Sequence, residues 1–145
     1  MQNPPPGQYG YSAPSGTGEK SSTGLDANIA ALLAYLFGLL SGVIFYVIEK
    51  NSRFVRFHAM QSILFNALVA VVFIGLSVVL SIFTMILANI SGALAGIVGI
   101  LSLLIWLVLI VAVFVGFIMC LIKAYHGQMY KLPFIGDMAE KFANK

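Results

Sequence analysis

The chain has 145 residues, of which 60% are hydrophobic and only 9% are charged. Its mean hydropathy of +0.98 lies well above the usual range for soluble domains. The formal net charge is +3, but Lys and Arg are scattered beside apolar segments and form no dense patch, which argues against nucleic-acid binding.

The first 25 residues are rich in Pro, Gly, Ser, Tyr and Gln. Such a segment buries too little apolar surface to offset its ordering entropy, so residues 1–25 are predicted to form a disordered tail. The run from Pro6 to Tyr11 is interpreted either as a flexible cap or as an interaction tail. The helical transmembrane domain is then expected to occupy residues 26–145.

The first apolar stretch predicts one membrane-spanning helix over about 27–48, since roughly 20 helical residues cross a hydrocarbon core about 30 Å thick. Asp26 and Asn28 are its candidate N-caps. Gly38 and Gly42 lie four residues apart, a spacing that permits either close approach of another helix or a local kink.

From Phe57 to Ile122 the chain runs 66 residues without an Asp, Glu, Lys or Arg. The break at 88–92 divides this stretch into expected spans within 55–87 and 93–122. A short helix over 138–142 is expected to lie on the membrane surface. The predicted fold class is therefore an all-α membrane protein with three transmembrane helices and a short C-terminal interfacial helix; four spans are the alternative.

Basic residues predict the orientation. They gather in the connection at 49–57 and in the C-terminal segment 123–145, whereas the 88–92 turn has none. Cytoplasmic loops carry the excess of Lys and Arg. With three spans, the C-terminus is predicted to be cytoplasmic and the N-terminus outside, in the plasma (inner) membrane of a prokaryote.

Small and hydroxyl residues recur along one arc of the second expected span, and they predict a helix-packing stripe. His58, Gln61 and Asn66 add polarity at its basic end, where interhelical hydrogen bonding is favoured over a shallow aqueous pocket. The stripe begins at Ala59 and ends at Ala88, and its central members are Ser62, Asn66, Ala70, Ser77, Ser81 and Thr84.

Arg53 and Arg56 lie three residues apart and project from neighbouring positions on a helix. They are candidate contacts for lipid phosphate. The simpler interpretation gives them a role in positive-inside orientation, with their side chains extended to the interface.

Three segments together resemble a prokaryotic family of small, uncharacterised membrane proteins, which is similar to the twenty-kilodalton subunit of the chloroplast inner-envelope protein-import translocon. These segments are 30–38 (AALLAYLFG), 48–62 (IEKNSRFVRFHAMQS) and 132–137 (LPFIGD). The resemblance covers about residues 27–142 and implies a polytopic helical membrane domain. It brings with it no established activity and no catalytic residue.

The candidate reactive side chains are far apart in the sequence and match no nucleophile, metal or phosphate motif. We therefore expect no catalytic, cofactor-binding or metal-binding residues, and no enzyme activity. The chain is expected to be a structural or interaction subunit of a membrane assembly, in contact with membrane lipids and with copies of itself or other membrane subunits; the alternative is a component of a protein- or solute-translocation complex. The side chains considered are Glu49, His58, Cys120, His126 and Asp137.

Overall fold

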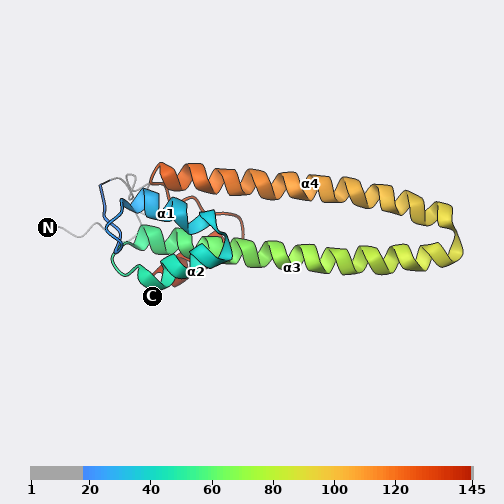
Figure 1. The fold of residues 1–145 in the computed structure, drawn as a ribbon, viewed down its shortest axis with the longest axis horizontal. Coiled ribbons are helices and arrows are strands. Elements are labelled where there is room, and N and C mark those ends of the chain that lie inside the picture. Colours follow the sequence, from blue (N-terminus) through green and yellow to red (C-terminus); the bar gives the residue numbers. More distant parts are fainter. Residues whose placement is uncertain (1–17, 145) are drawn as a thin grey trace.

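The computed structural model describes residues 18–144, which form five helices (Figure 1). These are α1 (Ala27–Leu36), α2 (Leu39–Ile48), α3 (Arg53–Ile90), α4 (Gly92–Tyr125) and α5 (Gly136–Ala143). Helices α1, α2 and α5 pack around one end of the long α3–α4 pair. We call residues 18–66 and 117–144 the base, and residues 67–116 the hairpin.

The expected first span is not one helix. The chain turns at Phe37 and Gly38, where Gly38 has a φ of +59°, a backbone conformation that favours glycine. The turn is fixed by Ser41, whose Oγ accepts the Phe37 N–H at 3.0 Å and donates to the Ala34 carbonyl at 3.0 Å. The Gly38–Gly42 spacing is compatible with a local kink or with close approach of another helix. At Gly38 the chain takes the first course, and the helix is broken there.

Helices α1 and α2 have 10 residues each, so each is about 15 Å long at 1.5 Å per residue. The two helices lie side by side and run in opposite directions (Figure 1). The segment before α1 therefore meets the residue after α2, where the Ser22 hydroxyl donates to Glu49. Neither helix is long enough to cross a 30 Å hydrocarbon core. The pair therefore replaces the predicted single span over 27–48 with a short helical hairpin.

Helices α3 and α4 are the two helices in the described part of the chain that are long and apolar enough to cross a membrane. They contain 38 and 34 residues, or about 57 and 51 Å. Only Ser91 lies between them, with extended backbone, inside the break predicted at 88–92. The structure therefore has two such helices where the sequence analysis expected three spans.

Gly42 brings α2 close to α3. A Cβ at this position would lie 3.0 Å from the Ala59 carbonyl oxygen and 3.0 Å from Ile63 Cγ1. Small residues permit this separation between helix backbones. The close approach predicted from the glycine spacing thus occurs at Gly42.

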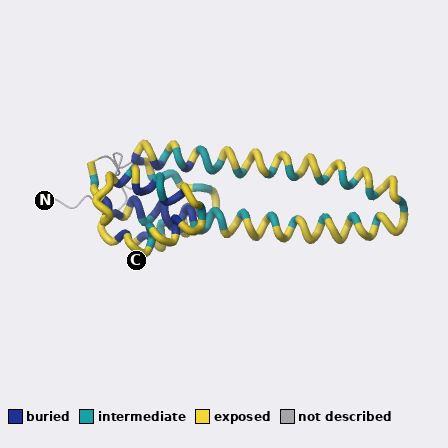
Figure 2. The backbone as a smooth tube through the Cα atoms, viewed as in Figure 1, coloured by how far each residue is buried: buried dark blue, intermediate teal, exposed yellow. Residues whose placement is uncertain are grey.

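The C-terminal segment returns to the base through α5, which includes the residues of the helix expected at 138–142. Its Ala139 and Ala143 pack against Phe57 of α3. Glu140 anchors the helix, with Oε2 2.7 Å from Lys131 Nζ and Oε1 3.2 Å from an Arg53 guanidinium nitrogen. Figure 2 shows that burial is concentrated in the base, whereas the hairpin is mostly exposed.

The predicted disorder of the tail does not extend to residues 18–25; residues 1–17 lie outside the described part of the chain. Ser21 is 4% exposed and its N–H donates to the Leu25 carbonyl at 2.9 Å. The Ala27 N–H donates to the Glu19 carbonyl at 2.9 Å. These bonds close a compact loop immediately before α1.

Candidate functional site

A buried polar cluster joins three helices at the centre of the base. Tyr35 comes from α1, His58 and Gln61 from α3, and Cys120 from α4, and none is more than 1% exposed. Tyr35 Oη lies 3.1 Å from His58 Nδ1, and Gln61 Nε2 donates to Tyr35 Oη at 3.3 Å. These bonds confirm that His58 and Gln61 make interhelical hydrogen bonds.

The partners determine the direction of this hydrogen-bond chain. His58 Nε2 faces the Gln128 carbonyl oxygen at 3.1 Å, and a carbonyl only accepts, so Nε2 carries the proton. His58 Nδ1 is then the acceptor for the Tyr35 hydroxyl. Gln61 Nε2 also donates to the Tyr130 carbonyl at 3.0 Å. The cluster therefore fastens the segment after α4 to α1 and α3.

His58 and Cys120, which are far apart in the sequence, meet in this cluster. Cys120 Sγ lies 3.5 Å from Gln61 Nε2, and both ring nitrogens of His58 already have other partners. A cysteine nucleophile needs a neighbouring base to form the thiolate. Here the imidazole is directed to Tyr35 and the backbone, so the arrangement is suited to holding the base together.

A second polar cluster surrounds Glu49, which is 2% exposed. Its carboxylate accepts the backbone N–H groups of Asn51 at 3.0 Å and Ser52 at 2.9 Å. Ser22 donates through both its N–H and its hydroxyl, the latter at 2.7 Å, and the Ser21 hydroxyl donates as well. One carboxylate thus ties the segment before α1 to the turn between α2 and α3.

These donors change the acidity of Glu49. Burial alone would raise the pKa of its carboxyl, but hydrogen bonds from Ser21, Ser52 and Ser22 favour the charged form and lower the pKa to about 2. Glu49 is therefore an ionised acceptor in the folded base at neutral pH.

Arg53 and Arg56, the predicted lipid-phosphate contacts, both have partners within the base. Arg53 pairs with Glu140 of α5 at 3.2 Å. The Arg56 guanidinium lies 5.2 Å from the centre of the Tyr46 ring of α2, within the range of a cation–π contact. Both residues remain near the charged end of the molecule, and a lipid contact stays a prediction.

The predicted packing stripe divides into two parts. Ala59 and Ser62 are buried in the base, where Ser62 Oγ donates to the Gly38 carbonyl at 3.2 Å. Asn66 is half-buried and donates to the Ser62 carbonyl at 2.8 Å within its own helix. Ala70 is exposed. The lower part of the stripe is therefore a helix–helix contact, and the upper part is not closely packed.

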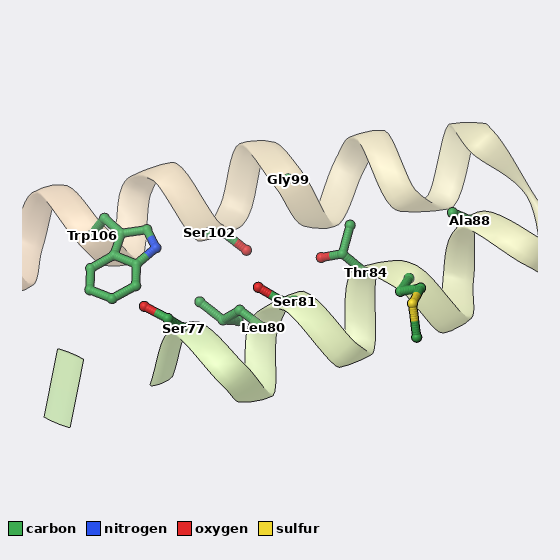
Figure 3. Close-up of a pocket in the computed structure, with 9 residues that line it drawn as sticks. Ser77, Leu80, Ser81, Thr84, Ala88, Gly99, Ser102 and Trp106 are labelled. Atoms are coloured by element: carbon green, nitrogen blue, oxygen red, sulfur yellow. The ribbon is translucent and has the colours of Figure 1, made fainter. Parts of the chain in front are cut away.

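The upper part of the stripe lines an open groove between α3 and α4, with a volume of about 570 Å³. In Figure 3 the hydroxyl groups of Ser81, Thr84 and Ser102 point into the space between the two helices. The lining residues are Ser77, Leu80, Ser81, Thr84, Met85 and Ala88 from α3, and Gly99, Ser102 and Trp106 from α4.

Two of these hydroxyls bond to their own helix rather than across the groove. Ser77 Oγ donates to the Phe73 carbonyl, and Ser102 Oγ donates to the Val98 carbonyl, both at 2.7 Å. Ser and Thr commonly form this bond to the carbonyl four residues earlier. A hydroxyl satisfied in this way needs no interhelical partner, so these two hydrogen bonds do not join α3 to α4.

Larger side chains at intervals of three or four residues make closer contact between α3 and α4. Phe73 lies 5.0 Å from Trp106 between ring centres. A second cavity of about 310 Å³ lies nearer the base and is lined by Asn66 and by aromatic and branched side chains from both helices. The half-buried residues of α3 in the hairpin are Val69, Phe73, Leu76, Leu80, Thr84 and Leu87.

Comparison with known proteins places the chain in a family. Residues 22–139 match the magnetosome magnetite crystal formation protein family. The chain belongs to this family. The match covers the base and the hairpin together and leaves out most of the predicted tail.

Similar proteins come from archaea and are named UPF0132 membrane proteins. One from Methanocaldococcus jannaschii is 41% identical over 86% of this chain and 94% of its own length. One from Archaeoglobus fulgidus is 38% identical over 79% of this chain and 92% of its own length. No solved structure matches.

These findings support membership of an uncharacterised family of membrane proteins, as the sequence resemblance implied. They do not show the similarity to the chloroplast translocon subunit. The two long apolar helices are consistent with the membrane location in the relatives' names. Among residues 18–144, no three His, Cys, Asp or Glu side chains gather as a metal site would require.

Sequence reasoning missed the Glu49 cluster and the part that Tyr35 plays. Ser21 and Ser22 fall within the predicted disordered tail, but in the structure their hydroxyls donate to Glu49, which is 27 or more positions away in the sequence. Tyr35 lies inside the apolar stretch that predicts the first span. The available signal was a tyrosine hydroxyl one turn after Ala31, on the same helix face, because a buried tyrosine hydroxyl needs a partner.

Proposed function

We propose that this protein is a non-enzymatic structural subunit of a membrane assembly, which associates with copies of itself through its hairpin. The observation that carries the proposal is the open groove between α3 and α4. A helix pair inside a folded protein normally fills such a space with side chains. A helix from a second copy would fill it here.

Small residues favour a second copy as the occupant. A Cβ at Gly92, Gly96 or Gly99 would meet nothing within 4 Å. Glycine surfaces in membranes let helix backbones approach closely, and dispersion contacts then hold the helices together. The large side chains of the hairpin are exposed as well, so contacts can extend on both sides of the groove.

The proposed placement has α3 and α4 crossing the membrane of a prokaryote with the base at the cytoplasmic face. Support comes from charge: every charged residue in the described chain lies in the base, and none lies between Phe57 and Ile122. An excess of Lys and Arg marks the cytoplasmic side. Two crossings put both ends of the described chain on that side, in place of the outside N-terminus predicted from three spans.

The test is disulfide crosslinking between copies in native membranes. Cys120 is replaced by Ser, and a single cysteine is introduced by Ser81→Cys in the groove. We expect a covalent dimer on mild oxidation, because paired grooves bring equivalent residues close together. Val79→Cys, on an exposed position away from the groove lining, is the matched control and should crosslink much less.

A second measurement separates self-association from other assemblies. The native protein is purified in mild detergent and analysed by native mass spectrometry. Oligomers of this chain alone support the proposal. Monomers, or stable complexes with other membrane proteins such as translocation components, contradict it and support the alternative from the sequence.

A further inference from the structure

Helix α2 presents an apolar face that no other part of the described chain covers. Leu40 is 65% exposed and Val47 is 67% exposed. At the tip of the α1–α2 pair, Phe37 is 74% exposed. The exposed apolar residues of α2 recur at helical spacing along one side of the helix, and they are Leu39, Leu40, Val43, Ile44, Val47 and Ile48.

This face can reach only one side of a bilayer. The tip of the α1–α2 pair lies beside Asn66, since a Cβ at Gly38 would be 2.9 Å from Asn66 Oδ1. From Asn66 to Ile90, where α3 ends, the helix rises about 36 Å at 1.5 Å per residue. With its headgroups the bilayer is about 40–45 Å thick. If the far end of the hairpin lies at the opposite membrane surface, the tip of the α1–α2 pair therefore lies just below the base-side surface, and α1 and α2 meet only that leaflet.

Charges next to this face fit the headgroups of that same leaflet. Lys50 follows α2 directly and is exposed, and Arg53 opens α3 with its side chain 56% exposed. Lys141 of α5 is also exposed at this end. Basic residues that border an apolar helix face attract anionic lipids. A lipid monolayer, apolar below and anionic at its surface, is therefore the partner whose chemistry matches.

We propose that the α1–α2 pair inserts into the base-side leaflet alone, and that the protein therefore favours strongly curved membranes whose convex side carries the base. The leaflet on that side accommodates α1, α2, α3 and α4, whereas the opposite leaflet accommodates only α3 and α4. Figure 1 shows this difference in width between the two ends of the molecule. A wider cross-section in one leaflet expands that leaflet relative to the other. This inference rests on the membrane placement proposed above and not on self-association.

The first experiment measures curvature preference. The full-length protein is inserted into a mixture of small and large preformed vesicles made of phosphatidylcholine with one-quarter phosphatidylglycerol. The far end of the hairpin is uncharged and should enter the vesicle first, which leaves the base outside. Cleavage at Lys141 by externally added trypsin checks this orientation. We expect a density on small vesicles about 3-fold or more above that on large ones, as for other curvature-sensitive insertions.

Matched variants assign the preference to the α2 face. Leu40→Gln combined with Val47→Gln makes the face polar and should abolish the preference while α3 and α4 still insert. Leu40→Val combined with Val47→Ile keeps the face apolar and should retain the preference. Equal density of the native protein on both vesicle sizes overturns the proposal, and so does an unchanged preference in the Gln variant.

A second measurement needs no destabilising change in the base. Phe37→Trp is made together with Trp106→Phe, so that the tip carries the single tryptophan. Lipids brominated along the acyl chain and supplied only to the outer leaflet should quench its fluorescence. Absence of quenching means that protein or water covers the tip and overturns the proposal. If the protein still forms oligomers in native mass spectrometry, the proposed self-association holds even though the proposed leaflet insertion has failed. The two measurements therefore test the two proposals separately.

Discussion

The base and the hairpin use similar amounts of apolar sequence in opposite ways. In the base, small residues lie inside: Ala27, Ala30, Ala31 and Ala34 of α1 are all 0% exposed. In the hairpin, large residues such as Val71 and Val108 point outward and are 69% exposed. Burial of apolar residues in the interior, as in the base, is also how a soluble core is built. Exposure of large apolar residues, as in the hairpin, is stable where the surroundings are themselves apolar.

Polar groups differ in the same way between the two regions. In the base they bond between helices, as Tyr35, His58 and Gln61 do. In the hairpin, Ser77 and Ser102 bond to carbonyls of their own helix. The comparison shows that the base is specified by contacts between segments, whereas each hairpin helix satisfies its own polar groups. Substitutions should therefore have much larger effects in the base.

The largest difference is expected between two glycines. Gly42→Leu should lower the free energy of unfolding by about 3 kcal/mol, because its side chain would push α2 away from Ala59 and Ile63. Gly75→Leu in the hairpin meets nothing within 4 Å and should be almost silent. Thermal unfolding in mild detergent, followed by circular dichroism, compares the two. Equal losses would remove the distinction between base and hairpin.

The buried cluster gives the next largest effect. Gln61→Leu leaves the Tyr130 carbonyl without its donor, which should lower stability by about 2 kcal/mol. Ser102→Ala removes only a bond within α4 and should change stability by less than about 0.5 kcal/mol. The same unfolding measurement applies. A Gln61→Leu protein as stable as the native one would mean that the cluster does not hold the base together.

Acid should weaken the base through Glu49, whose carboxylate joins the segment before α1 to the turn between α2 and α3. Since folding lowers the Glu49 pKa from its usual 4.5 to about 2, its stabilising contribution is complete above about pH 4.5. That contribution is lost as the pH falls from 4.5 toward 2, because the unfolded chain takes up the proton first. The melting temperature should therefore fall over this range. Glu49→Gln should flatten this part of the profile, and an unchanged slope in that variant would contradict the assignment.

The exposed ion pair between Arg53 and Glu140 should give the smallest effect. Its side chains are 56% and 33% exposed, and such pairs contribute about 0–1 kcal/mol. Arg53→Ala should thus lower stability by less than 1 kcal/mol, and by less still at high salt. A loss larger than that of Gln61→Leu would show that α5 and its pairing contribute more to the base than the buried cluster does.

The sequence was sufficient for the features that depend on local composition. The uncharged run from Phe57 to Ile122 predicted the long helices, and the break at 88–92 contains the observed turn. The close contact at Gly42 followed from residue size and spacing. Each of these conclusions needs only a helix period, a length and the exclusion of charge from an apolar region.

The first span was wrong because its outcome depends on contacts far along the chain. Residues 27–48 have enough apolar length for one helix, and Gly38 alone is compatible with either a kink or close packing. The turn is held by Ser41 on one side and meets Asn66 of α3 on the other. The Glu49 cluster likewise joins residues 27 positions apart. Periodicity within one segment contains no information about such partners.

The central claim is that the α1–α2 pair begins and ends on the same side of the membrane. Single cysteines at Ser22, Lys50 and Ser91, each in a Cys120→Ser background, are labelled with a membrane-impermeant maleimide in intact cells and in inverted membrane vesicles. Ser22→Cys and Lys50→Cys should react from the same, cytoplasmic side, and Ser91→Cys from the other. Labelling of the first two positions from opposite sides would show that residues 27–48 cross the membrane and would contradict this account.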